Sequence, residues 1–282
     1  MAAPLRGREP RWIKPVLLLA VALFLGAFLL LPLGLVLVQG LSLGGRAAWA
    51  AVSQPNALAA LRLSLLIAGV VVPVNTLLGL AAAWTFTRFD FAGKTLLLTL
   101  LDLPLAASPV LVGLMAVLLF GPQGWWGPWL GAHGMQVLNA PPAILLVTLF
   151  VTAPYVARQL IPLMRAQGSE QEQAALVLGA GPWTIFWRVT LPNIRGGLLN
   201  GILLCGARAV GEFGAVSVVS GRIPGRTETL PLRVDSLLRG GQSAAAFGVA
   251  SVLALLALLG MGLKAWLRWR WRKAAPAERG AA

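Results

Sequence analysis

Three charged residues lie deep inside long apolar runs of the sequence: Asp102, Arg208 and Glu212. A charge within a membrane-spanning segment is costly, so it usually faces a bundle interior or a water-filled path. Arg208 and Glu212 are four residues apart, so they share one helix face and can form an ion pair. Two interpretations follow for this pair: a lock that holds the bundle together, or part of a gate or anion path. Asp102 is a further pathway candidate.

Other site chemistry has little support in the sequence. The chain has one histidine, His133, and one cysteine, Cys205, so it has no zinc motif with two histidines and no disulfide framework. Ala92-Gly93-Lys94-Thr95 resembles the end of a phosphate-binding loop, but Arg88 stands where the first glycine is required. We therefore predict a protein that is not an enzyme and binds no metal, cofactor or nucleotide. If ATP drives it, another subunit must hydrolyse the ATP.

The composition indicates a protein that crosses a membrane several times. Of the 282 residues, 58% are hydrophobic and only 11% are charged, whereas a soluble domain has about 25% charged residues. An all-α fold is expected, because helices satisfy their own backbone groups in lipid. The net charge of +14 is assigned to basic residues that flank apolar runs and contact lipid headgroups, and not to nucleic-acid binding.

Six apolar segments are long enough to span a bilayer: residues 15–38, 58–86, 95–120, 143–164, 196–221 and 243–266. The first is too long for the core of a cleaved signal peptide, so we expect it to be retained. Between the third and fourth lies a segment rich in Gly and Pro, in which Trp125, Trp126 and Trp129 suit the aromatic belt at the outer membrane surface.

The distribution of basic residues predicts the topology and the domain boundaries. Most of the 23 basic residues fall on one side if both termini are cytoplasmic, as the positive-inside rule requires. We expect a basic tail at 1–14, a membrane domain at 15–266 and a second basic tail at 267–282. The exception is the outer loop at 222–242, which contains four arginines. Such a loop would concentrate an anion or dock an extracytoplasmic partner, and a solvated loop with no special role is the further alternative.

Residues 168–192 form a polar loop between the fourth and fifth spans. Ser169 and Glu172 have the spacing of a capping box, and Gly179 can end the helix that they begin. Pro182 suits the start of a second helix, which Pro192 would end. The result would be a compact knob that docks a soluble partner through three aromatic anchors, Trp183, Phe186 and Trp187. An amphipathic helix at the membrane surface is the alternative.

This loop resembles the EAA loop of ABC-transporter permeases of the binding-protein-dependent importer type. Ala174-Ala175, three residues, Gly179, nine residues and then Val189-Thr190-Leu191-Pro192 have the spacing of that motif. Gln173 stands where the family usually has Glu, and Val189 where it often has Ile. The resemblance implies a permease (MetI-like) fold in which the loop couples to an ATP-binding subunit. The coupling residues that it implies are Gln173, Ala174, Ala175, Gly179, Pro182, Leu191 and Pro192.

Further segments are similar to sulfate and thiosulfate permeases: Asp102-Leu103-Pro104, Ser108-Pro109-Val110, Arg208-Ala209, Gly211 to Gly221, and Thr229-Leu230-Pro231-Leu232. The similarity covers about residues 55–265. It implies a subunit in the bacterial inner membrane that forms half of a pathway with a related second permease. Two copies of an ATP-binding subunit, which bind ATP and Mg²⁺, and a periplasmic sulfate-binding protein would complete the importer.

Three alternatives remain at this stage. The Gly-Glu-Phe-Gly-Ala segment at 211–215 is shared with molybdate permeases, so a permease for molybdate or another oxyanion is one alternative. A secondary transporter or channel that works without ATP is another. The third is a membrane anchor that only positions a partner.

Overall fold

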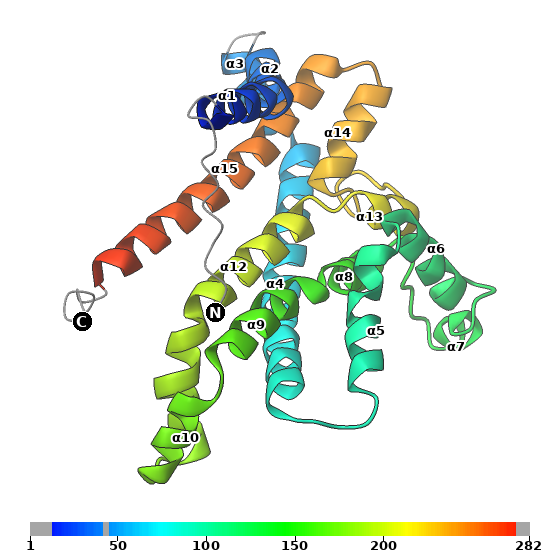
Figure 1. Ribbon diagram of the computed structural model, residues 1–282. Coiled ribbons are helices and arrows are strands. Elements are labelled where there is room, and N and C mark those ends of the chain that lie inside the picture. Colours follow the sequence, from blue (N-terminus) through cyan, green and yellow to red (C-terminus); the bar gives the residue numbers. More distant parts are fainter. Residues whose placement is uncertain (1–12, 42–44, 275–282) are drawn as a thin grey trace.

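The computed structural model describes residues 13–41 and 45–274, and every regular element within these ranges is a helix (Figure 1). The N-terminal half contains α1 (Ile13–Leu25), the π-helical turn η1 (Gly26–Leu30), α2 (Leu31–Leu41), α3 (Gly45–Val52), α4 (Pro55–Arg88), α5 (Lys94–Ala106), α6 (Pro109–Phe120) and α7 (Gly127–Ala132). The C-terminal half contains α8 (Pro141–Thr152), α9 (Pro154–Gln167), α10 (Glu170–Val177), α11 (Pro182–Ile185), the π-helical turn η2 (Phe186–Thr190), α12 (Leu191–Val210), α13 (Gly214–Val219), α14 (Leu230–Arg239) and α15 (Ser243–Ala274).

The described residues contain five helices that are long and apolar enough to cross a membrane. They are Ile13–Gly40, Pro55–Arg88, Pro141–Gln167, Pro182–Val219 and Ser243–Leu267. The α5–α6 pair makes a sixth span if the two bent helices are counted together. The all-α, multi-pass prediction is confirmed. Most of both predicted basic tails, at 1–12 and 275–282, lies outside the described residues.

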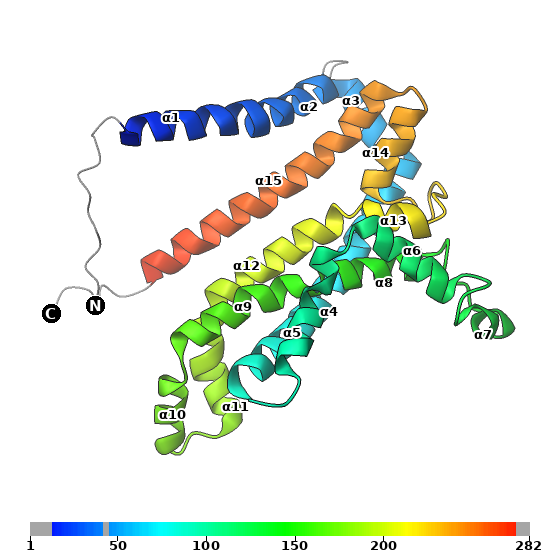
Figure 2. The ribbon, with the colours of Figure 1, turned by 45° about the vertical axis from the view of Figure 1, so that its right-hand side comes forward.

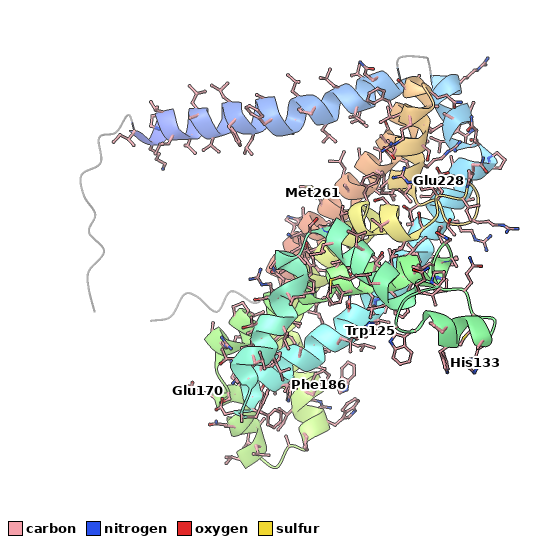
Figure 3. All side chains as sticks on the ribbon, turned by 90° about the vertical axis from the view of Figure 1, so that its right-hand side faces the viewer. Trp125, His133, Glu170, Phe186, Glu228 and Met261 are labelled. Carbon is pink, nitrogen blue, oxygen red and sulfur yellow. The ribbon has the colours of Figure 1, made fainter. Side chains whose placement is uncertain are left out.

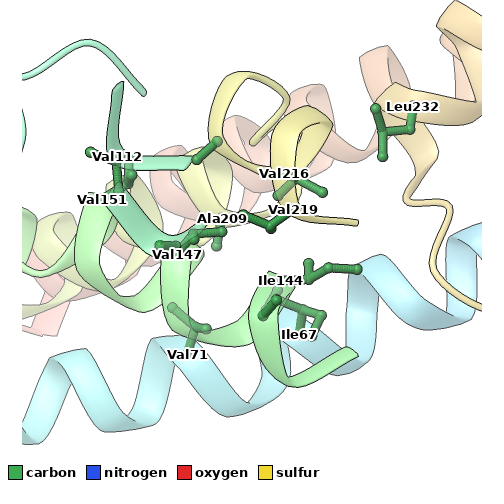
Figure 4. Close-up of a cluster of buried hydrophobic side chains, with 14 residues drawn as sticks. Ile67, Val71, Val112, Ile144, Val147, Val151, Ala209, Val216, Val219 and Leu232 are labelled. Atoms are coloured by element: carbon green, nitrogen blue, oxygen red, sulfur yellow. The ribbon is translucent and has the colours of Figure 1, made fainter. Parts of the chain in front are cut away.

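The long helix α4 is the centre of the bundle, and the three buried apolar clusters all include residues from it. Near its middle, Ile67 and Val71 pack with α6, α8 and α13 (Figure 4). Towards its C-terminus, Ala83 and Phe86 pack with α9 and α12. Its first turn packs with α14 and α15 through Ala57. A single helix therefore connects both ends of the molecule.

Two glycines allow α4, α9 and α12 to cross closely. A Cβ atom added at Gly79 of α4 would lie 2.7 Å from the Cβ of Val156, and one at Gly201 of α12 would lie 3.0 Å from the Cα of the same valine. Small residues are the usual means of close helix approach in membranes. Val156 of α9 is therefore tightly packed between α4 and α12.

The junction of α8 and α9 is a helix break whose freed carbonyl is satisfied by a side chain. The N–H of Ala153 donates to the carbonyl of Phe150 instead of that of Leu149, and Pro154 supplies no N–H. The buried Asn75 of α4 donates its Nδ2 to Leu149 O at 3.0 Å and to Thr152 Oγ1 at 2.8 Å. Because an unsatisfied carbonyl is costly in lipid, Asn75 ties the break to α4.

The third predicted span is not a single straight helix. The chain bends by 106° between α5 and α6. Ala107 and Ser108 are extended, as expected for residues just before Pro109. The prediction of one helix over 95–120 was wrong. Apolar composition indicates that a segment lies in the membrane, but it does not show whether the helix axis changes direction within that segment.

The fifth predicted span differs at both ends. Pro192 does not end the second helix of the 168–192 loop, because the helix that begins at Pro182 continues through η2 into α12. In η2 the N–H of Leu191 donates to the carbonyl of Phe186, five residues earlier. This wider turn accommodates the following proline. At the other end, a break at 211–213 separates α12 from α13.

The molecule has two ends, which we call inner and outer. The inner end holds the turn at 89–93 and helices α10 and α11, and the outer end holds α3, α7 and α14 (Figures 1 and 2). Figure 2 shows α1 diverging from the bundle, and none of the apolar window in Ile13–Gly40 is buried. Within this span, α2 packs against α15 at the outer end. The described residues therefore leave most of this first span without a cover.

Candidate functional site

The 168–192 loop folds into a helical knob at the inner end. Figure 3 shows Glu170 of this knob on the opposite side of the molecule from His133, which follows α7. Gly179 ends α10: it has φ +82°, a conformation that favours glycine, and its N–H donates to Leu176 O at 2.9 Å. Pro182 is in the first turn of α11. The predicted pair of helices with a glycine break is therefore present.

Glu172 fixes this knob to the rest of the molecule. Its Oε1 lies 2.8 Å from Arg88 Nη2, at the C-terminus of α4, and also accepts the hydroxyl of Thr190 at 2.7 Å. The side chains of Glu172 and Arg88 are each only 16% exposed. The carboxylate therefore connects α10, the start of α12 and the inner end of the central helix.

The predicted capping box was wrong, because Glu172 is used in this network. Neither side chain caps α10, and Ser169 instead accepts Gln173 Nε2 at 2.9 Å. Gln173 is exposed, so the residue that differs from the usual family Glu points out of the knob. No motif indicated the contact between Arg88 and Glu172, because 84 residues separate the two partners.

The knob ends in an exposed apolar tip. Leu176, Val177 and Leu178 are 61%, 86% and 87% exposed. Ala174 is also exposed, and Ala175 is half-buried. Exposed neighbouring apolar side chains indicate an interaction surface. The tip was missed by the prediction of aromatic anchors, although its three adjacent apolar residues in a polar loop were the available signal.

The aromatic residues of the knob have two different roles. Phe186 packs edge-on against Trp84 of α4, with ring centroids 5.7 Å apart. Trp183 and Trp187 are 73% and 51% exposed and contact Phe186 on its outer sides. One ring anchors the knob to α4, and the other two add to the exposed apolar surface.

The predicted Arg208–Glu212 ion pair is present near the end of α12. Arg208 Nη2 lies 2.8 Å from Glu212 Oε2, and the other carboxylate oxygen accepts the N–H of Ala215 at 2.9 Å. Glu212 is 1% exposed, whereas Arg208 is 30% exposed. The carboxylate thus joins α12 to the first turn of α13 across the helix break, an arrangement that fits the lock better than an open path.

Asp102 is in a different environment. It pairs with Arg158 of α9, with 3.0 Å between Arg158 Nε and Asp102 Oδ1. Both side chains are about half exposed. This contact was not predictable from the sequence, because 56 residues separate Asp102 from Arg158.

The outer loop at 222–242 contains one helix, α14, after a stretch of turns, and three of its four arginines are paired. Arg222 and Arg239 lie 2.6 and 2.9 Å from the carboxylate of Asp235. Burial raises the pKa of Asp235, but the hydrogen bonds and charges of Arg239 and Arg222 outweigh it and bring the pKa below its usual value. Arg233 pairs with the buried Glu228, and Arg226 is the exposed arginine that has no ion pair with a described residue.

Two spaces within the described residues lie away from the charged candidates. A space of about 520 Å³ lies in the outer hairpin around Gly131 and Leu138, and one of about 550 Å³ lies between α12 and α15. Neither is lined by Asp102, Arg158, Arg208 or Glu212. Within the described residues, no group of three or more His, Cys, Asp or Glu side chains could hold a metal ion.

Residues 75–273 match the family described as binding-protein-dependent transport system inner membrane component, and the chain belongs to this family. It is 46% identical over 254 residues to the sulfate transport system permease protein CysW of Escherichia coli K12, covering 90% of this chain and 87% of that protein. It is 49% identical over 255 residues to CysW of Synechocystis, covering 90% and 92%. The Escherichia coli K12 permease CysT is 35% identical over 237 residues, covering 84% and 86%.

Solved structures share the fold. A bacterial alginate ABC transporter, crystallised with its periplasmic protein bound to an alginate pentasaccharide, has a chain that superposes with a TM-score of 0.75. The match covers 90% of this chain and 92% of that one at 16% sequence identity. The chain is therefore a multi-pass membrane permease subunit of the ABC importer type, and not itself an enzyme. A partner permease, an ATPase and a binding protein belong with such a subunit.

Proposed function

We propose that the chain is one of two permease subunits of an ATP-driven importer for sulfate or thiosulfate. The observation that carries the choice of anion is 46–49% identity to sulfate permeases over 90% of the chain. The second permease would be a related but different chain, as the additional similarity to CysT supports. Both termini would be cytoplasmic, because that orientation puts most basic residues inside.

Two copies of an ATP-binding subunit would bind ATP and Mg²⁺, and a periplasmic sulfate-binding protein would deliver the anion. This chain binds no cofactor in the proposal. Its knob docks on the ATPase through the exposed tip at 176–178 and the coupling residues around it. The exposure of Leu176, Val177 and Leu178 supports this role. When a partner covers apolar side chains that were in contact with water, the free energy of the complex falls.

ATP binding would draw the two knobs together and move the spans between inward-open and outward-open states. The contacts of Glu172 supply a route by which motion of the knob reaches the membrane spans. A displacement of α10 acts on Arg88 and Thr190, and thereby on α4 and α12. Since α4 packs in all three apolar clusters, a shift of its inner end affects the whole bundle.

Uptake by cells tests the choice of anion. A strain that lacks its own sulfate importer would receive this chain with its partner subunits, and uptake of labelled sulfate and labelled molybdate would be compared. Sulfate uptake that excess thiosulfate inhibits and molybdate does not is the expected result. Uptake of molybdate alone would favour the other oxyanion class. Sulfate uptake that persists without the ATPase would indicate a secondary transporter or channel.

A further inference from the structure

The Asp102–Arg158 ion pair uses only one edge of the arginine. Arg158 Nε lies 3.0 Å from Oδ1 of Asp102, and Nη2 lies 3.5 Å from Oδ2. A guanidinium has five N–H donors, so the edge formed by Nη1 and the second hydrogen of Nη2 remains available. Nη1 makes no hydrogen bond to a described residue. The side chain is 55% exposed, so a ligand can reach this edge.

The pair lies at membrane depth. Asp102 is a little over two helical turns beyond Lys94 at the inner end of α5, which is about 12 Å along the helix. Arg158 is about 14 Å from the inner end of α9 at Gln167. Because the hydrocarbon core is about 30 Å thick, both positions are near its middle.

Lipid is a poor cover for a half-exposed ion pair at that depth. Charged groups inside a membrane almost always face other protein or a water-filled cavity. The bend of 106° between α5 and α6 turns α6 away from the line of α5. A water-filled path satisfies the remaining arginine donors, whereas an apolar helix of a partner would leave them unsatisfied.

We propose that Arg158 is an oxyanion-binding residue of the transport pathway, and that Asp102 positions it and limits its affinity. A planar guanidinium edge binds two oxygens of a tetrahedral oxyanion at once. Asp102 holds the opposite edge, so the plane is fixed before the anion arrives. The carboxylate also offsets the positive charge. A transport site must bind weakly enough to release its ion, and an arginine without a counter-ion would retain a dianion.

This inference rests on the proposed oxyanion import, and the test separates the two. Intact complexes with wild-type and variant chains would be reconstituted in vesicles, and sulfate uptake and ATP hydrolysis would be measured per assembled complex. If the wild-type complex transports no sulfate, the proposed function fails. If it does, the variants test Arg158.

Arg158→Lys should lower uptake about tenfold or more, because the charge remains while the bidentate edge is lost. ATP hydrolysis stimulated by the loaded binding protein should stay within about twofold of wild type, since the knob is intact. Asp102→Asn should slow uptake because the anion is released more slowly. Arg165→Gln, two turns further along the same helix face and without an ion pair to a described residue, should behave as wild type.

A neutral pair distinguishes a pathway role from a structural one. Asp102→Asn combined with Arg158→Gln keeps a hydrogen bond between α5 and α9 but removes the guanidinium. We expect this double variant to assemble and to remain inactive in uptake. Wild-type uptake by the double variant, or by Arg158→Lys, would overturn the proposal. So would reduced assembly of Arg158→Lys with normal uptake per assembled complex, which would identify the pair as a contact with the partner permease.

Discussion

Glu172 accepts two short hydrogen bonds from different parts of the chain. A residue without a carboxylate at this position would lose the ion pair. Arg88 and Thr190 both reach the same carboxylate oxygen, at 2.8 and 2.7 Å. Each partner is mostly buried, so solvent competes little with these contacts. Hydrogen bonds to charged groups typically contribute about 1.5–3 kcal/mol. The link between the knob and α4 is therefore strong enough to carry displacement.

A charge swap tests this link. Glu172→Arg and Arg88→Glu alone should each lower sulfate uptake per ATP hydrolysed by about tenfold, because like charges then face each other. The combined variant should recover much of the coupling. Glu170→Arg is the matched control, since Glu170 is an exposed acid on the same helix. Uncoupling by the single variants with no recovery in the combined one would mean that the ion pair is not the link.

Glu212 is expected to act as a lock between α12 and α13. Glu212→Gln keeps an acceptor for the N–H of Ala215 but loses the ion pair with Arg208. We expect a loss of about 1–3 kcal/mol in the free energy of unfolding, seen as a lower midpoint in thermal unfolding of the purified chain in detergent. Glu212→Ala loses both contacts and should be less stable still. Unchanged stability in both variants would return this pair to the list of pathway candidates.

At the scale of elements, α10 combines a fixed side and an exposed side. Glu172 faces α4, while the tip at 176–178 lies in solvent. Gly179 ends the helix directly after the tip, so the chain returns towards α11 without covering it. The first turn of α10 is therefore fixed to α4, and the C-terminal end of α10 is exposed.

Replacing the tip should weaken docking of the ATPase and leave the membrane part intact. Leu176, Val177 and Leu178 changed together to Ser should lower affinity for the ATP-binding subunit at least about tenfold, because each buried apolar side chain contributes roughly 1.5–3 kcal/mol. Co-purification and a titration with the isolated ATPase measure this. Leu238→Ser, at an exposed position of α14 on the outer end, is the control. Equal affinity in the triple variant would place the contact elsewhere.

Hydropathy predicted the spans well, because lipid forces each crossing to be long, apolar and helical. It could not predict the geometry of the breaks. Pro109 follows a sharp bend, whereas Pro192 is accommodated in a continuous helix by a π-helical turn. The difference lies in the neighbouring backbone and not in the proline itself. Contacts between distant residues, such as Arg88 with Glu172 and Arg158 with Asp102, were not predictable because a single sequence does not show which residues of different helices meet.

At the scale of the whole molecule, the isolated chain is an incomplete bundle. The first span is unburied, and the Asp102–Arg158 pair is open at membrane depth. Both features are expected of one half of a pathway whose other half is a second permease. The outer end, with Arg226 exposed and its other loop arginines paired, and the inner end, with its apolar knob, offer chemically different surfaces for different partners.

The most direct test of this account is transport by the purified complex. This chain, its partner permease and the ATP-binding subunits would be reconstituted in vesicles with the sulfate-binding protein on the opposite side from ATP. Labelled sulfate should accumulate against its gradient only when ATP and Mg²⁺ are present on the side of the knob. Accumulation without ATP, or no sulfate accumulation by a complex that hydrolyses ATP in response to the loaded binding protein, would contradict the account.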